Sequence, residues 1–260
     1  MNIVVCIKQV PDTTEVRIDP VKGTIIRDGV PSIMNPDDKG GLELALRIKD
    51  SYGAHVTVIT MGPPQADEIL REAFAMGADE AIHLSDRRFA GADTLATSNA
   101  LAGALRTLKC DLIITGRQAI DGDTAQVGPQ IAELLDLPQV SYVESLEYDG
   151  KGTIVARKAT EEGYQRVEVH TPCLLTSVVP TKEARYMSVP GILEAYTREV
   201  KVWSADNIEV DESKLGLKGS PTKVFKSFSK GAKPAGVMHE VSPEEAVDII
   251  IAKLQEKFII

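Results

Sequence analysis

The feature that most restricts the fold is a series of short runs that are apolar on both faces, namely IVVCI, VTVIT and LIIT. A strand that is apolar on both faces needs cover on both faces, and a parallel sheet obtains that cover from helices on either side. Helical patterns separate the runs: we expect strands at 3–10, 56–61, 82–84 and 112–115 and helices at 39–50, 69–76 and 95–108. The sequence therefore predicts an α/β fold, a three-layer αβα arrangement with a mostly parallel sheet.

The pattern changes after Leu137-Pro138 to segments in which apolar and polar residues alternate. These segments are Tyr142–Tyr148, Thr153–Lys158 and Gln165–His170, and the turn-forming residues DGKG and EEG separate them. Alternation with short turns of this kind is typical of an antiparallel hairpin. The apolar run Cys173–Val179 then returns to the sheet as a further strand.

The last part of the chain differs from the rest, because residues 204–240 are polar and rich in Gly, Lys and Ser. We expect an extended arm there, which divides the chain into an α/β domain at 1–203 and an arm with a C-terminal helix at 204–260. That helix is predicted to begin at Pro243, since Ser242 and Glu245 form an S-x-x-E capping box.

Charge and composition exclude several classes of protein. The net charge is 29 minus 38, or −9, which argues against nucleic-acid binding. No stretch approaches the roughly 18 apolar residues of a membrane span, so we expect no membrane insertion. The opening MNIVVCIKQV has no basic leader, which favours a cytoplasmic location. Cys6, Cys110 and Cys173 form no CxxC pair and are expected to be buried, reduced thiols.

The sequence lacks the common catalytic and phosphate-binding motifs. GxGxxG does not follow the first strand, and GxxxxGK[ST] and GxSxG are absent. The four histidines have no acid or cysteine at ligand spacing, so we expect no metal site. We accordingly predict no general acid, general base or covalent nucleophile in this chain.

The most informative segment is Gly116–Pro129, which directly follows the strand at 112–115. Ligands of open parallel sheets bind beyond the carboxyl ends of the strands, where glycines allow backbone N–H groups to approach phosphates. Asp123 or Thr124 is predicted to cap the following helix, whose N-terminus also attracts phosphate. Hydrogen-bonding side chains come from Gln118, Asp121 and Gln126. The alternative is a surface turn with a helix cap, which accounts for about half of these residues.

Two other strand ends point to the same edge of the sheet. They are Cys6–Asp12, where Pro11 ends the strand, and Thr60–Pro63, where Gly62 permits a tight turn into a helix. A third element, Met34–Asp38, precedes the helix at 39–50, and its alternative interpretation is again a helix cap. Three such loops at one edge favour a nucleotide pocket.

Through these residues the sequence resembles the β (small) subunit of electron transfer flavoproteins over nearly its whole length. The resemblance is carried by IVVCIKQVPD, ITMGPPQ, FAMGADEAIHL, LIITGRQAIDGDTAQVGP, VARKATEEGYQRVEVHTPCLLT and EARYMSVPGI. It implies a Rossmann-like sheet of the adenine nucleotide alpha hydrolase-like type and a heterodimer with an α subunit that carries a redox-active FAD. The β subunit of such a pair lends a C-terminal arm to the shared flavin domain.

The resemblance also implies the ligand and its contacts. Ordinary members hold AMP in this pocket, whereas the electron-bifurcating members of anaerobes hold a second FAD that is reduced by NADH. The GDTAQVGP version of the loop resembles the bifurcating branch. The family's nucleotide contacts map here onto Cys6, Asn35, Pro36, Asp37, Asp38, Met61, Gly116, Arg117, Gln118, Ala119, Ile120, Asp121, Gly122, Asp123, Thr124, Ala125, Gln126 and Val127.

The proline-bounded loop within Pro180–Pro190 leads into a segment, Lys182–Leu193, that resembles the loop by which the family docks dehydrogenases. The expected docking residues are Arg185, Tyr186, Met187, Val189 and Ile192. The alternative is an ordinary loop folded against the chain's own surface.

The favoured hypothesis is an electron carrier that binds FAD and takes part in NADH-dependent electron bifurcation to an acyl-CoA dehydrogenase and to ferredoxin or flavodoxin. A rival hypothesis is an AMP-binding subunit that shuttles electrons from dehydrogenases. A third, from another class, is an adenine-nucleotide sensor without redox function.

Overall fold

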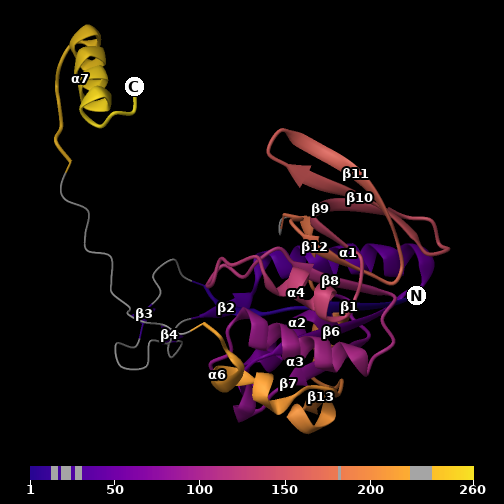
Figure 1. Ribbon diagram of the computed structural model, residues 1–260. Helices are drawn as coiled ribbons and strands as arrows, with labels where there is room; N and C mark the ends of the chain where they lie inside the picture. The colour runs from indigo at the N-terminus through magenta and orange to yellow at the C-terminus, as the bar shows by residue number, and fades with distance from the viewer. Residues whose placement is uncertain (13–16, 19–24, 27–30, 181–182, 223–235) are drawn as a thin grey trace. The chain divides into compact units, whose positions relative to one another are not determined.

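The computed structural model of the chain describes residues 1–12, 17–18, 25–26, 31–180, 183–222 and 236–260 (Figure 1). It contains two compact units, Met1–Ser227 and Phe228–Ile260. The strands are β1 (Asn2–Cys6), β2 (Gln9–Pro11), β3 (Arg17–Ile18), β4 (Ile25–Ile26), β5 (Ser32–Met34), β6 (His55–Met61), β7 (Glu80–Leu84), β8 (Leu112–Gly116), β9 (Gln139–Tyr148), β10 (Thr153–Thr160), β11 (Gly163–His170), β12 (Cys173–Ser177) and β13 (Val200–Trp203). The α-helices are α1 (Pro36–Tyr52), α2 (Asp67–Met76), α3 (Thr94–Arg106), α4 (Val127–Leu134), α5 (Val189–Ala195), α6 (Gly216–Gly219) and α7 (Pro243–Glu256).

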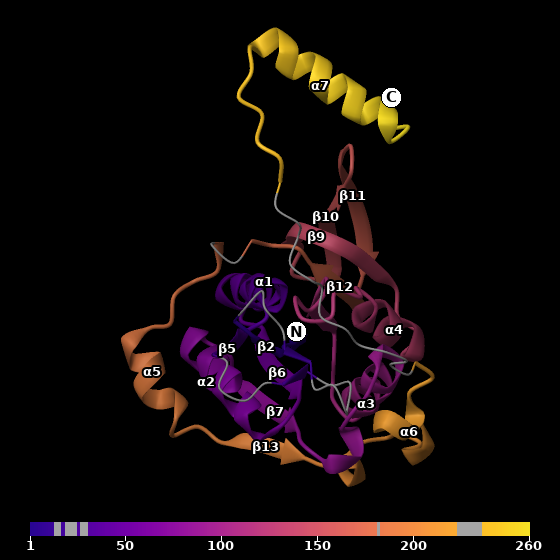
Figure 2. The same cartoon turned by 90° about the vertical axis from the view of Figure 1, so that its left-hand side faces the viewer.

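The first unit is built on a nine-stranded sheet in the order β11-β10-β9-β12-β8-β1-β6-β7-β13. Neighbouring strands from β9 to β13 in this order are parallel, whereas β10 pairs in antiparallel fashion with both β9 and β11. Helices cover both faces: α1 and α2 lie on one side of the sheet and α3 and α4 on the other (Figure 2). The expected three-layer αβα fold is confirmed.

Strand β1 shows how the apolar runs create two cores. Ile3 and Val5 point into the core shared with α1 and α2, whereas Val4 and Cys6 point into the core shared with α3 and α4. All four are buried. A polar residue at any of these positions would enter one core or the other, which explains why the run has no polar member.

The expected strand at 3–10 is divided in two. Strand β1 ends at Cys6, and the amide of Lys8 donates to Asp38 Oδ2 at 2.8 Å instead of continuing the parallel ladder. The chain then forms β2, which pairs in antiparallel fashion with β5 in a small separate sheet. The pattern of residues 3–10 did not reveal this break, because Asp38, which accepts from the Lys8 amide, lies 30 residues away.

The alternating segments form the predicted hairpin. Strand β10 pairs with β9 on one side and with β11 on the other, both antiparallel. Strand β12 returns to the sheet between β9 and β8, parallel to both. The hairpin therefore extends the parallel sheet at one edge without interrupting its central strands.

The segment from Ser204 to Ser220, which the sequence assigns to the arm, packs on the α/β core. Ala205, Ile208 and Leu215 are buried in the core that contains α3, and β13 pairs with β7 just before them. Short 3-10 turns space these apolar residues irregularly, so no helical or strand period announces them.

The structure does not describe residues 223–235 of the expected arm or Lys182 of the expected docking loop.

In the second unit, α7 begins at Pro243 with the predicted capping box: Ser242 Oγ accepts from the Glu245 amide, and the Glu245 carboxylate accepts from the Ser242 amide. Among the described residues, no helix combines the length and the hydropathy that crossing a bilayer requires.

Candidate functional site

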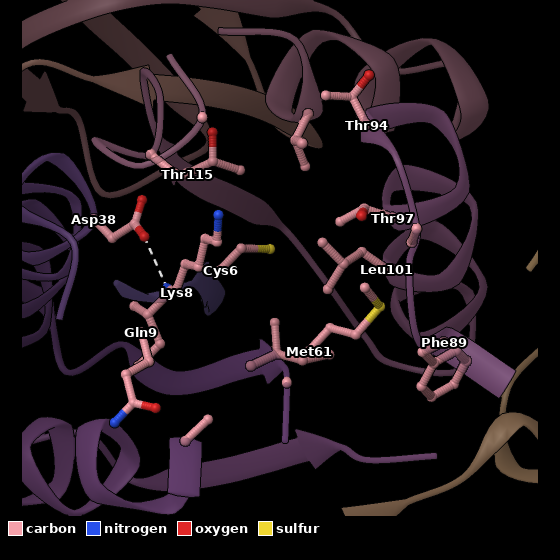
Figure 3. Close-up of a pocket in the computed structure, with 18 of the residues that line it drawn as sticks. Cys6, Lys8, Gln9, Asp38, Met61, Phe89, Thr94, Thr97, Leu101 and Thr115 are labelled. Atoms are coloured by element: carbon pink, nitrogen blue, oxygen red, sulfur yellow. Dashed lines mark hydrogen bonds between the residues drawn. The ribbon is translucent and has the colours of Figure 1, made fainter. Parts of the chain in front are cut away.

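A cavity of about 940 Å³ lies at the carboxyl ends of β1, β6 and β8 (Figure 3). Cys6, Met61 and Gly116, the last residues of these strands, line it. Ligands of open parallel sheets bind in this crevice, and small-molecule pockets typically have volumes of roughly 300–1,000 Å³. Position and size therefore make this cavity the candidate binding site.

Gly116 ends β8 in direct contact with the first turn of α1. A Cβ at this position would overlap Asp38 Oδ1 and lie 2.8 Å from the Asp38 backbone nitrogen. The Gly116 amide donates to Asp38 Oδ1 at 2.9 Å. Only glycine allows the strand and the helix to approach this closely.

Asp38 joins two strand ends beneath the cavity. Its carboxylate accepts from the Lys8 amide at 2.8 Å and from the Gly116 amide at 2.9 Å, and the side chain lines the cavity. Burial raises the pKa of Asp38 to about 7, and hydrogen bonds from Asn35 and the two amides act in the opposite direction. Asp38 therefore positions backbone on both sides of the site.

Asn35 stands at the start of α1 but does not cap it. Its Nδ2 donates to the Gln118 carbonyl oxygen at 2.8 Å, and its Oδ1 accepts from the Ile120 amide at 3.1 Å. Asn35 is fully buried. The alternative interpretation of Met34–Asp38 as a helix cap is therefore wrong for Asn35, whose side chain holds the loop after β8.

Two ion pairs attach the same loop to neighbouring elements. Arg117 Nε lies 3.3 Å from Asp37 Oδ2, and Lys8 Nζ lies 2.6 Å from Asp121 Oδ1. Burial raises the pKa of Asp37, whereas Arg117 lowers it. Together with Asn35, these pairs fix the first half of the loop.

The second half of the loop, from Asp123 to Gln126, differs from the expectation. Helix α4 begins only at Val127, and neither Asp123 nor Thr124 caps it; Gln126 occupies the cap position without a side-chain capping bond. Asp123 instead accepts from Gln118 Nε2 at 2.8 Å. Asp123 and Ala125 have φ of 49° and 52°, so this stretch is bent too sharply for a cap at either expected residue.

The start of α4 consequently lies at the cavity, and no side chain caps its first backbone N–H groups. Val127 and Gly128 line the cavity. The Gln126 side chain does not turn back on the helix but accepts from Thr94 Oγ1 at 2.8 Å. Uncapped N–H groups and the positive end of the helix dipole together favour an anionic group such as a phosphate.

Apart from Met61, the sequence did not reveal the wall opposite this loop. Phe89, Leu101 and Met61 form its apolar part, and the hydroxyl-bearing side chains of Thr94 and Thr97 lie beside them (Figure 3). Two sequence signals could have indicated this wall. One is Asp93, which caps α3 by accepting from the Ala96 amide, and the other is the three-residue spacing of the two threonines. The site thus has a polar end at the loop and an apolar end at this wall.

Not all of the predicted contact residues reach the cavity. Twelve of them line it: Cys6, Asp38, Met61, Gly116, Arg117, Gln118, Ala119, Gly122, Thr124, Ala125, Gln126 and Val127. The other six are not among its lining residues: Asn35, Pro36, Asp37, Ile120, Asp121 and Asp123. Of these six, Asn35, Asp37 and Asp121 hold the loop from behind.

The one cysteine that lines the cavity is not suited to nucleophilic attack. Burial raises the pKa of the Cys6 thiol far above its ordinary value, which keeps the sulfur protonated and unreactive. The cysteines are free, and Cys6 and Cys173 are buried as expected. Within the described ranges, no group of three or more His, Cys, Asp or Glu side chains is arranged to hold a metal ion.

The expected docking residues lie on one stretch of surface, but not all of them in a loop. Val189 and Ile192 belong to α5, which begins after the cap Ser188, whose Oγ accepts from the Gly191 amide. Tyr186 is 96 % exposed and Val189 73 % exposed. Arg185 is turned inward and pairs with the buried Glu43. It therefore lies mostly beneath this surface and contributes little exposed area to it.

Comparisons with known proteins agree with this architecture. Residues 22–208 match the model of the electron transfer flavoprotein domain. The chain is 62 % identical, over 99 % of both chains, to an electron transfer flavoprotein subunit beta of Clostridium acetobutylicum. It is 54 % identical, over the full length of both chains, to the caffeyl-CoA reductase-Etf complex subunit CarD of Acetobacterium woodii. It is also 44 % identical, again over full length, to the acryloyl-CoA reductase electron transfer subunit gamma of Anaerotignum propionicum.

Proposed function

The chain belongs to the electron transfer flavoprotein family as a β subunit, and we propose that its cavity binds FAD for NADH-dependent electron bifurcation. In this proposal the two electrons of NADH are divided between ferredoxin or flavodoxin and an acyl-CoA dehydrogenase. The protein acts as a heterodimer with an electron transfer flavoprotein α subunit in the cytoplasm. The flavin supplies the redox chemistry, and this chain supplies the binding site.

The observation that carries the proposal is the size of the cavity and the contrast between its two ends. About 940 Å³ is near the upper end of the usual range for small-molecule sites. The uncapped start of α4 is suited to phosphate, and the wall of Phe89, Leu101 and Met61 is suited to a planar apolar ring. A dinucleotide that contains a flavin combines both kinds of group in one extended molecule.

The residues of the site fit such a ligand. Gly116, Val127 and Gly128 line the polar end, where the absence of a Cβ on Gly116 lets β8 approach α1 closely. Lys8 and Arg117 add positive charge, each already balanced by a carboxylate. The hydroxyls of Thr94 and Thr97 provide hydrogen-bonding groups between the two ends.

AMP is the rival ligand, and the polar end alone favours it. The loop from Gly116 to Val127 with the start of α4 provides all the donors that a mononucleotide phosphate needs. A mononucleotide is smaller than FAD and would fill less of the cavity of about 940 Å³. In that case the subunit would be structural and would help dock dehydrogenases in a conventional electron shuttle.

The names of two relatives support an acyl-CoA-type partner. One is a subunit of a caffeyl-CoA reductase-Etf complex and the other an electron transfer subunit of acryloyl-CoA reductase. We propose that the exposed residues of the α5 region, with Val189 at their centre, dock such a dehydrogenase. Exposed aliphatic and aromatic side chains are the usual anchors of protein interfaces.

The test is to purify this chain with its large subunit, release the non-covalent ligands by denaturation, and count FAD and AMP per heterodimer. Two FAD and no AMP would support the bifurcating proposal. One FAD with one AMP would replace it with the conventional shuttle, and adenine nucleotide without flavin or partner subunit would indicate the sensor.

A further inference from the structure

We propose that Arg71 of α2 is a positioning residue that fixes α5 in the shape a partner protein recognises. The inference rests on the proposed docking function of the α5 region. The docking surface is ordered before the partner binds, because Glu43 of α1 and Arg71 of α2 form hydrogen bonds to its backbone. Arg71 itself is largely covered and offers little surface to a partner.

Helix α5 has little of its own to stabilise it. It contains seven residues, whereas isolated helices shorter than about 12–15 residues are marginal in water. Leu193 and the adjoining Tyr196 are about three-quarters exposed, and Ala195 is the buried residue within the helix. Apolar burial therefore does not account for its order, and other contacts must hold it.

Arg71 supplies these contacts at the end of α5. Its Nη1 donates to the Ala195 carbonyl oxygen at 2.8 Å and to the Arg198 carbonyl oxygen at 2.6 Å. Carbonyls at the end of a helix lack partners within the helix, so a cation that binds them stabilises that end. Asp67 in turn orients the guanidinium, with Nε 2.9 Å from Oδ2 and Nη2 3.3 Å from Oδ1.

The beginning of the segment is held just as closely. The Ser188 amide donates to the Ala75 carbonyl oxygen at 3.2 Å. A Cβ on Gly191 would lie 2.5 Å from that same oxygen, so α5 sits directly against the end of α2. Both ends of α5 are thus attached to α2, and its outer face is left free.

A surface that is ordered in advance binds without the cost of ordering it on contact. Val189, Leu193 and Tyr196 owe their common orientation to α5, and Arg71 also approaches the Tyr196 ring at 5.9 Å. Lysine is no substitute for Arg71, because a single ammonium cannot reproduce the planar fork that bonds Asp67 and two carbonyls together.

The experiment uses the intact heterodimer and an acyl-CoA dehydrogenase as the probe. Amide hydrogen exchange of residues 189–196 reports the order of α5, and titration with the dehydrogenase gives the Kd. For Arg71→Met we expect the amide exchange rate and the Kd each to rise about tenfold. The reason is the loss of the two charge-assisted hydrogen bonds to backbone carbonyl oxygens. Arg71→Lys should fall between this variant and wild type, with flavin content unchanged in both.

Arg106→Met is the matched control, because Arg106 also donates to two backbone carbonyl oxygens, those of Leu134 at 2.7 Å and Glu209 at 3.4 Å. It should lose similar stability without a change in Kd. Equal weakening by the two variants would mean general destabilisation and would overturn the inference.

The variant Val189→Asp distinguishes a failure of the proposed role of Arg71 from a failure of the proposed docking function. If Val189→Asp weakens binding and Arg71→Met changes neither Kd nor exchange, the docking surface stands and the role of Arg71 is refuted. If Val189→Asp leaves the Kd unaltered, the docking function itself fails, and the positioning role fails with it.

Discussion

The cavity and the α5 surface are both shaped by side chains that bond to backbone, but in different surroundings. At the cavity the anchoring side chains, Asn35 and Asp38, are buried. At α5, Arg71 bonds to backbone carbonyl oxygens with its side chain 17 % exposed, and the nearby Arg185, 29 % exposed, pairs with carboxylates. A buried group that loses its partner bears the full cost of desolvation, whereas an exposed one is rehydrated. The same kind of contact should therefore matter far more at the cavity.

The largest effect is expected for Gly116→Ala. The added Cβ overlaps Asp38 Oδ1 and crowds backbone, so β8 and α1 must move apart. We expect the free energy of unfolding to fall by about 5 kcal/mol and the heterodimer to lose the ligand of this cavity. Denaturant titration and ligand counting measure the two effects. Gly236→Ala is the control, because its Cβ meets nothing within 4 Å; similar losses there would refute the steric argument.

Asp38→Asn should change how stability depends on pH. Burial raises the pKa of Asp38 from 3.8 to about 7, so the folded state keeps this proton over a range in which the unfolded state has lost it. The contribution of Asp38 to stability therefore falls as pH rises from about 4 to about 7, by on the order of 4 kcal/mol. Denaturation at pH 5, 6 and 7 should give a flatter profile in the variant, and an unchanged slope would contradict the assignment.

Asn35→Ala should lower the free energy of unfolding by about 3 kcal/mol, because it removes a buried side chain and leaves two partly buried backbone groups without their partner. These groups are the Gln118 carbonyl and the Ile120 amide. Denaturant titration measures the loss. Asn99→Ala is the control: Asn99 donates only to the Leu95 carbonyl of its own helix, and its loss should be nearly neutral. A cost for Asn35→Ala no larger than that of the control would show that the loop is held by other contacts.

The role of Asn35 also marks the limit of what the sequence predicts. Apolar runs and local turns identified the strands, the hairpin and the loop after β8, since each depends on neighbouring residues. Asn35 and Asp38 look like cap residues in the sequence, yet their partners lie 30 to 85 residues away. The wall of Phe89, Thr94 and Thr97 was missed for a related reason: only the fold brings α3 to the end of β8.

The smallest effect is expected at the α5 region, for Arg185→Met. Burial alone would raise the pKa of Glu43, but hydrogen bonds from Arg185 and Arg47 lower it below its ordinary value. This pair therefore stabilises the protein at neutral pH and loses its effect as pH falls through the lowered pKa of Glu43, the opposite direction from Asp38. We expect a cost of about 1 kcal/mol at pH 7, because Arg47 still pairs with Glu43 at 3.0 Å.

The difference between Arg185→Met and wild type should shrink between pH 7 and a pH below the lowered pKa of Glu43, as denaturant titration at the two pH values would show. Lys253→Met, which removes an exposed ion pair with Glu256, should cost only a few tenths of a kcal/mol at either pH. If Arg185→Met lowered the free energy of unfolding as much as Asn35→Ala, the partly exposed Arg185 would stabilise the protein as much as the buried Asn35 at the cavity. The contrast between the two regions would then lie in their shape alone, and solvent access would not explain how each is held.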